Sequence, residues 1–134
     1  MIRIQKQDFD IGSEIETLTR GRHGIGGIAS FLGVVRSEPG DNSVSALTLE
    51  HYPAMTAKQL LEIETEARRR WDLCASLIVH RYGRLTPGDR IVLVVTAAGH
   101  RQVALDSCGC LIDWLKTKAP FWKHEETPSG GRWV

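Results

Sequence analysis

The stretch Arg90-Ile-Val-Leu-Val-Val-Thr-Ala97 decides the fold, because nearly all of its side chains are apolar and most are β-branched. Such residues favour strands. The apolar run continues only to Ala98, far short of the ~20 residues that a membrane-spanning helix needs. A strand that is apolar on both faces belongs in the interior of a sheet. We therefore predict a central strand here.

A long helix is predicted directly after this strand, from His100 to Lys118, where Pro120 forces its end. A second helix is predicted from Ala54 to Trp71. Both segments repeat apolar residues at helical spacing, which is typical of a helix with one buried face. The predicted buried residues are Ala104, Cys108, Leu111, Ile112 and Leu115 in the later helix, and Leu60, Ile63, Ala67 and Trp71 in the earlier one.

The remaining segments alternate between predicted strands and turns. Ser13 to Arg20 is predicted as a short helix, with Ser13 as N-cap and Glu16 completing a capping box. Residues 37–43 and 86–89 are rich in turn-forming residues, and the first of these segments is predicted as an exposed loop. Further strands are predicted around Ile2 and Ile4 and over residues 28–35, 44–52, 77–82 and 121–134, the last with a turn at 128–131. This order is no regular βαβ alternation, so we predict one α+β domain over residues 1–134 with a largely antiparallel sheet.

The composition indicates an ordinary globular protein and excludes several classes of function. Hydrophobic residues make up 42% and charged residues 25% of the chain. The net charge of +1, from 17 basic and 16 acidic residues, gives no support to nucleic-acid binding. The first residues contain no apolar signal-peptide core. Three cysteines, an odd number, favour free thiols in a reducing, cytoplasmic compartment.

The junction Gly99-His100-Arg101 is the first candidate site. A helix that begins here points free N–H groups and the positive end of its dipole into solvent. Acidic residues are favoured in a first turn, yet the sequence has His and Arg. A bound anion would resolve this conflict. The alternative is a solvated Arg beside a surface His.

Three further cations are candidates. Lys123 follows Phe121 and Trp122, and a lysine against aromatic walls loses solvation and can act as a base or nucleophile. The alternative is a lysine that extends along an edge strand. Lys116 lies near a helix C-terminus, where cations are favoured in any case. Arg36, after a strand and before the predicted loop, suits a phosphate clamp or an ordinary capping role.

The histidines give no sign of a metal site. No metal-ligand spacing links the five histidines, and neither a phosphate-binding loop nor a dinucleotide fingerprint is present. His51 and His80 lie within or at the end of predicted strands, where we interpret them as structural. Cys108 is predicted to be buried and inert, Cys74 to be in the core, and Cys110 to point away from the buried face of its helix.

Taken in order, these segments resemble the molybdopterin synthase large-subunit family essentially from end to end. The resemblance is carried by Phe31-Leu-Gly-Val-Val-Arg36, Leu49-Glu-His-Tyr-Pro-Ala-Met55, His80-Arg-Tyr-Gly83, Gly99-His-Arg101, Asp113-Trp-Leu-Lys-Thr-Lys-Ala-Pro-Phe-Trp-Lys-His-Glu125 and Gly131-Arg-Trp-Val134. The resemblance implies an α/β hammerhead domain joined to a small antiparallel β subdomain. It also implies a homodimer in which each chain binds one small ubiquitin-like subunit, giving a heterotetramer.

The resemblance also implies the reaction. The small subunit carries sulfur as a thiocarboxylate on its C-terminal Gly-Gly tail, and two transfers to cyclic pyranopterin monophosphate form the dithiolene of molybdopterin. No metal or cofactor is implied, because the sulfur arrives already activated. The implied pocket residues are Lys116 and Lys123 as catalytic groups and, for substrate, Phe31, Arg36, His100 and Arg101.

Two expectations follow from these implied roles. Arg36 is expected to lie near His100 and Arg101, so that the three form one anion site for the substrate phosphate. Many relatives continue past the Gly-Arg-Trp-Val motif with a tail that reaches toward the partner protomer, and this sequence stops there. The two pockets of the dimer are therefore expected to work largely independently. A binding module without turnover and a structural interaction protein remain as alternatives from other classes.

Overall fold

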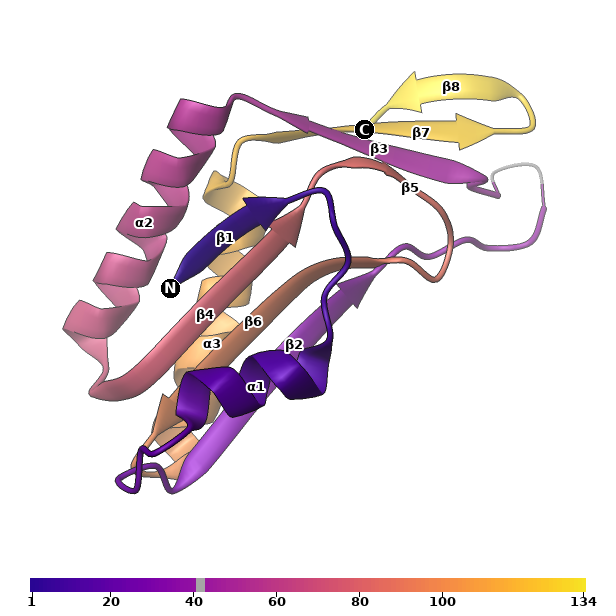
Figure 1. The fold of residues 1–134 in the computed structure, drawn as a ribbon. Helices are drawn as coiled ribbons and strands as arrows, with labels where there is room; N and C mark the ends of the chain where they lie inside the picture. The colour runs from indigo at the N-terminus through magenta and orange to yellow at the C-terminus, as the bar shows by residue number, and fades with distance from the viewer. Residues whose placement is uncertain (41–42) are drawn as a thin grey trace.

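The computed structural model describes residues 1–40 and 43–134, and it arranges them as two sheets and the helices that pack on the larger sheet (Figure 1). The class is α+β, as predicted, with a helix-covered sheet joined to a smaller antiparallel one. The loop predicted over residues 37–43 lies partly outside the described residues. Within the described part of the chain, no helix is long and apolar enough to cross a membrane.

The larger sheet has the strand order β1-β4-β6-β2. Its strands are β1 (Ile2–Gln5), β4 (Leu73–Arg81), β6 (Arg90–Ala98) and β2 (Gly27–Val34). The apolar stretch of residues 90–97 lies in β6, between β4 and β2, and runs antiparallel to both. Its predicted interior position is confirmed. β1 pairs with β4 in parallel, so the sheet is largely antiparallel.

Side chains alternate between the two faces of β6, and each face has its own helical cover. Leu93 and Val95 pack on the face of α1 (Ile11–Thr19). Val94 packs on the opposite face, in the core that contains buried residues of α2 (Pro53–Arg70) and α3 (Arg101–Lys118). Most of the predicted helical stripes is confirmed there, since Leu60, Ile63, Ala67, Ala104, Cys108 and Leu111 are buried. Trp71, Ile112 and Leu115 were also predicted to be buried, but they are half-buried against the same core.

The smaller sheet has the strand order β5-β3-β7-β8. Its strands are β5 (Gly83–Leu85), β3 (Ala46–His51), β7 (Phe121–Thr127) and β8 (Gly130–Trp133). Val35, Leu47, Leu49 and Leu85 form its core. The predicted turn after residue 127 joins β7 to β8 as a hairpin, whereas β5 was not predicted from the sequence. Because β7 follows α3 directly, this sheet lies at the C-terminal end of that helix (Figure 1).

Two predicted element starts are wrong. α1 begins at Ile11 with Asp10 as N-cap, and the Asp10 carboxylate accepts a hydrogen bond from the Ser13 N–H at 2.9 Å. Ser13 therefore lies inside the first turn, and Glu16 pairs with Arg20 instead of closing a capping box. β4 begins at Leu73, four residues before the predicted start, because its pairing with β6 extends to Ala98.

The start of α3 is fixed by a close approach of backbone to backbone. A side chain at Gly26 would collide with the carbonyl oxygen of Gly99, and one at Gly27 would lie 3.0 Å from the Cα atom of Arg101. The Gly26 N–H also donates to the Ala98 carbonyl at 2.8 Å. Glycine at these positions lets β2 begin directly beneath the first turn of α3.

Candidate active site

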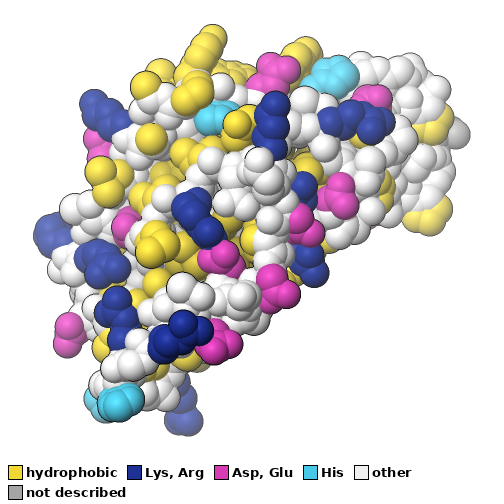
Figure 2. All heavy atoms as spheres, in the orientation of Figure 1, with side chains coloured by type: hydrophobic (Ala, Val, Ile, Leu, Met, Phe, Trp, Pro, Cys, Tyr) yellow, Lys and Arg dark blue, Asp and Glu magenta, His cyan; other side chains and the backbone are white. Residues whose placement is uncertain are grey.

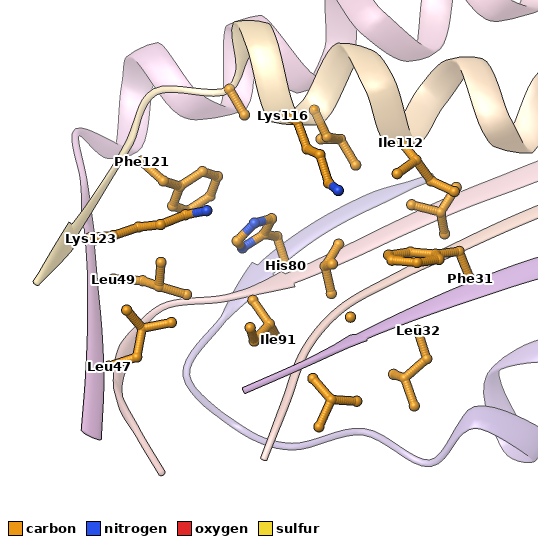
Figure 3. Close-up of a pocket in the computed structure, with 16 residues that line it drawn as sticks. Phe31, Leu32, Leu47, Leu49, His80, Ile91, Ile112, Lys116, Phe121 and Lys123 are labelled. Atoms are coloured by element: carbon orange, nitrogen blue, oxygen red, sulfur yellow. The ribbon is translucent and has the colours of Figure 1, made fainter. Parts of the chain in front are cut away.

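A cavity of about 360 Å³ lies between the larger sheet, the last turns of α3 and the smaller sheet (Figure 3). Its floor comes from β2, β4 and β6, and its walls come from α3, β3 and β7. The lining residues are Phe31, Leu32, Gly33, Val34, Leu47, Leu49, His80, Ile91, Val92, Val94, Ile112, Leu115, Lys116, Ala119, Phe121 and Lys123. We call this cavity the main pocket.

Lys116 and Lys123 reach the main pocket from two different elements (Figure 3). Lys116 lies in the last turn of α3, next to Leu115, which packs against the core. Lys123 lies on β7, where side chains alternate between the two faces of the strand. Phe121 and Lys123 line the pocket, while Trp122 between them is 43% exposed and packs edge-on against Tyr52.

The pocket combines positive charge with an apolar wall. Among the lining residues that the structure describes, none is acidic, so no carboxylate neutralises the two ammonium groups inside the cavity. A low-dielectric wall strengthens electrostatic interactions at such a site. The arrangement therefore suits an anion that brings an apolar or backbone surface with it. No group of His, Cys, Asp and Glu suited to hold a metal ion occurs among the described residues.

His80 is the remaining polar side chain of the main pocket. It ends an otherwise apolar part of β4, is 9% exposed, and stacks on Phe121 with ring centroids 3.8 Å apart. Burial lowers the pKa of His80 to about 4, and the nearby charge of Lys123 acts in the same direction. The ring is therefore neutral at pH 7. His80 was predicted to be structural, and a lone histidine within an apolar strand does not by itself distinguish a pocket residue from a structural one.

A second cavity adjoins the main pocket and contains Arg36. The two cavities share Lys123, Leu47, Val34 and Ile91 in their walls. Arg36 is exposed and pairs with Glu38 at the surface. The structure thus brings Phe31, Lys116 and Lys123 into one pocket and places Arg36 in the adjoining cavity.

His100 and Arg101 lie at the far end of the molecule from these residues. They begin α3, and the fifteen steps along this helix from Arg101 to Lys116 correspond to about 22 Å. Gly27, beneath Arg101, begins β2, whereas Arg36 follows its other end, about 23 Å away at ~3.3 Å per residue. The expectation that one chain forms a single anion site from Arg36, His100 and Arg101 is therefore wrong.

The cysteines lie away from the main pocket, since none of the three lines it. Cys108 is buried as predicted, and burial raises the pKa of its thiol, which makes the reactive thiolate scarce. Cys110 and Cys74 are half-buried, so Cys74 is less enclosed than predicted.

Comparison with known proteins gives consistent results in sequence and structure. The family described as MoaE protein matches residues 4–118. The molybdopterin synthase catalytic subunit of Ralstonia nicotianae is 51% identical over 133 residues, which cover 99% of this chain and 76% of the relative. The solved MoaE protein of Burkholderia ambifaria is 51% identical with a TM-score of 0.86, over 100% of this chain and 88% of that one.

A more distant structure shares the fold. It is a complex of subunits 1 and 2 of the molybdopterin-converting factor from Helicobacter pylori, with a TM-score of 0.81 at 19% identity, covering 99% of this chain and 89% of that one. Together, the fold and the relatives define a sulfur-transfer enzyme of molybdenum cofactor biosynthesis. Within that class, the chain belongs to the MoaE family, whose curated relatives are catalytic subunits of molybdopterin synthase.

Proposed function

We propose that the main pocket receives the thiocarboxylate-bearing Gly-Gly tail of a small ubiquitin-like subunit and transfers its sulfur to cyclic pyranopterin monophosphate. The observation that carries this proposal is the convergence of Lys116 and Lys123 in one apolar cavity without a carboxylate. A thiocarboxylate is an anion, and glycines bring no side chain that would have to fit beside the wall. The two-subunit complex of the Helicobacter pylori relative supports a partner of this kind.

The proposed roles follow from position and charge. Lys116 acts as acid–base catalyst, or stabilises the negative charge that develops on the oxygen of the attacked acyl carbon. Lys123, in the wall of both cavities, holds the thiocarboxylate where it meets the pterin. Arg36 binds anionic oxygens of the substrate from the second cavity. Phe31 supplies a flat apolar surface on the pocket floor.

His100 and Arg101 serve this site from a second copy of the chain. The family resemblance implies both a homodimer and a substrate-binding role for these two residues. Because one chain holds them about 22 Å from Lys116, they can join its pocket only across a dimer. The earlier expectation of independent pockets is therefore replaced by a shared one. We place the enzyme in the cytoplasm, which its free cysteines favour.

The first test is turnover with thiocarboxylated small subunit and the pterin precursor. Lys116→Ala should reduce the rate by ~10²–10⁴, the usual effect of losing a positioned acid–base group. Lys118→Ala is the matched control, because Lys118 lies two residues away in the same helix but stacks on Trp114, 5.2 Å from the ring centre. More than half the activity in a folded Lys116→Ala variant would refute the catalytic role. An inactive wild-type enzyme would instead favour a binding module.

A further inference from the structure

His80 has no task in the roles given above, although it lies in the wall of the main pocket. Among the lining residues that the structure describes, only His80, Lys116 and Lys123 have polar side-chain atoms. The lysine ammonium groups can only donate hydrogen bonds, whereas a neutral imidazole also offers a nitrogen lone pair. His80 is therefore the side-chain acceptor in a wall whose other polar groups are donors.

Two contacts fix the tautomer and the orientation of this ring. The Nδ1 atom of His80 lies 2.8 Å from the carbonyl oxygen of Arg81. A carbonyl oxygen only accepts, so Nδ1 carries the hydrogen and Nε2 carries the lone pair. The ring also stacks on Phe121 at an interplanar angle of 11°. Because burial lowers the pKa of His80 to about 4, the lone pair is free at neutral pH.

Strand β7, whose Phe121 stacks on the His80 ring, also carries Lys123, which can donate hydrogen bonds. Lys123 follows Phe121 by two residues on β7, so both side chains lie on one face of the strand. Figure 3 shows His80 between Lys116 and Lys123, with the end of Lys123 directed toward the imidazole. The charge of Lys123 also lowers the pKa of His80, as expected of an ammonium close to the ring.

We propose that His80 is a positioning residue for Lys123: the lone pair on Nε2 attracts the Lys123 ammonium and so holds this side chain in the pocket. The inference rests on the proposed function, in which Lys123 binds the thiocarboxylate. A lysine whose rotamers are already restricted loses less conformational entropy when the anion arrives. His80 thus improves catalysis without contacting the reacting atoms.

Two substitutions at this position separate the acceptor from the rest of the ring. In His80→Asn, the side-chain amide can still donate to the Arg81 carbonyl, but nothing replaces Nε2. In His80→Gln, the longer side chain places an amide oxygen near the position of Nε2. We expect kcat/KM for the thiocarboxylated subunit to fall about tenfold in His80→Asn, as for the loss of one contact to a charged group, and to recover largely in His80→Gln.

Thermal unfolding of both variants shows whether each is folded, so that rates refer to folded enzyme. A merely structural histidine would be replaced poorly by both residues, without selective rescue by Gln. Equal losses in the two variants, or full activity in His80→Asn, would overturn the proposal.

A second measurement needs no turnover. In ¹⁵N spectra of the imidazole, Nδ1 should be protonated and Nε2 unprotonated in the wild-type protein. Lys123→Met should shift the Nε2 signal, whereas Lys118→Met, on the surface beside Trp114, should not. An Nε2 signal that does not change in Lys123→Met refutes this attraction, even if the His80 variants fold poorly. This readout does not use the pterin. The positioning role of His80 can therefore be refuted while the proposed function is confirmed by turnover, or confirmed while turnover is absent.

Discussion

At the scale of single residues, the main pocket depends on how few polar side chains enter it. Lys116, Lys123 and His80 bring the polar atoms, and the rest of the wall is apolar or backbone. His80 remains neutral because burial disfavours its charged form. The burial that keeps His80 neutral in the pocket therefore also links the stability of the protein to pH.

This linkage gives a prediction with a definite sign. Above pH 6.5 His80 is neutral in the folded and the unfolded chain and contributes no pH dependence. Between pH 6.5 and about 4 the unfolded chain binds a proton that the folded chain does not, so the free energy of unfolding falls as pH falls. The loss reaches roughly 3 kcal/mol near pH 4, at ~1.4 kcal/mol per pH unit.

Urea unfolding at pH 7.5, 6.0 and 5.0 measures this slope. His80→Gln should flatten it, whereas His23→Gln should not, because His23 is exposed. A slope that is the same in wild type and His80→Gln would show that His80 is not the group responsible.

The sequence predicted some of the site residues but not their partners. Lys123 was a candidate because aromatic residues precede it, and the pocket does contain it. His80 was not a candidate, because a lone histidine in a strand is indistinguishable from a structural one until the smaller sheet is placed beside it. Only the fold brings Phe121, 41 residues further along the chain, against its ring, and Lys123, 43 residues further, near enough for its charge to act on it.

At the scale of elements, helix starts are set by local hydrogen bonds that several sequence patterns satisfy equally well. Ser13 and Glu16 match a capping box, but Asp10 caps the same helix three residues earlier. Asp10→Ala should therefore lower the free energy of unfolding by about 1 kcal/mol. Ser13→Ala should change it little, because Ser13 lies exposed within the first turn. Chemical denaturation of both variants tests the assignment, and a larger loss for Ser13→Ala would contradict it.

The glycines before β2 hold the first turn of α3 in place, which allows a second prediction at this scale. Gly26→Ala would press a methyl group against the carbonyl oxygen of Gly99. This oxygen belongs to the backbone, so it cannot move aside as a flexible side chain would. We expect a loss of about 1–3 kcal/mol in stability, the usual range for overpacking. Gly24→Ala is the control, because no atom lies within 4 Å of the added carbon. Thermal unfolding measures the stability of both variants. Equal stability would show that the contact between residue 26 and the Gly99 carbonyl relaxes freely.

At the scale of the whole molecule, α3 separates two groups of cations that the family resemblance assigns to one site. The lysine pocket lies at its C-terminal end, and His100 and Arg101 lie at its start. A continuous apolar run predicted β6, and apolar residues at helical spacing predicted α3, because burial in one core determines both patterns. The cavity was not predictable, because it depends on how the smaller sheet packs beside that core.

Mixed dimers test whether these groups act together. Sedimentation at micromolar concentration should first show a dimer. Lys116→Ala and Arg101→Ala homodimers should each be nearly inactive, but their mixture should regain about a quarter of wild-type turnover after random subunit exchange. In that mixture, half the dimers keep one pocket with both groups intact. No recovery after confirmed exchange would mean that Arg101 and Lys116 do not share a pocket across the dimer.

If the main pocket receives the thiocarboxylate as proposed, its apolar wall also has a consequence for fidelity. A thiocarboxylate that meets water instead of the pterin is spent as carboxylate and hydrogen sulfide, and the carrier must then be charged again. A wall built of Phe31, Leu49, Ile91, Ile112 and similar residues leaves few places where an attacking water could be held. Its main effect is then not speed but yield, as the fraction of delivered sulfur atoms that end in the dithiolene.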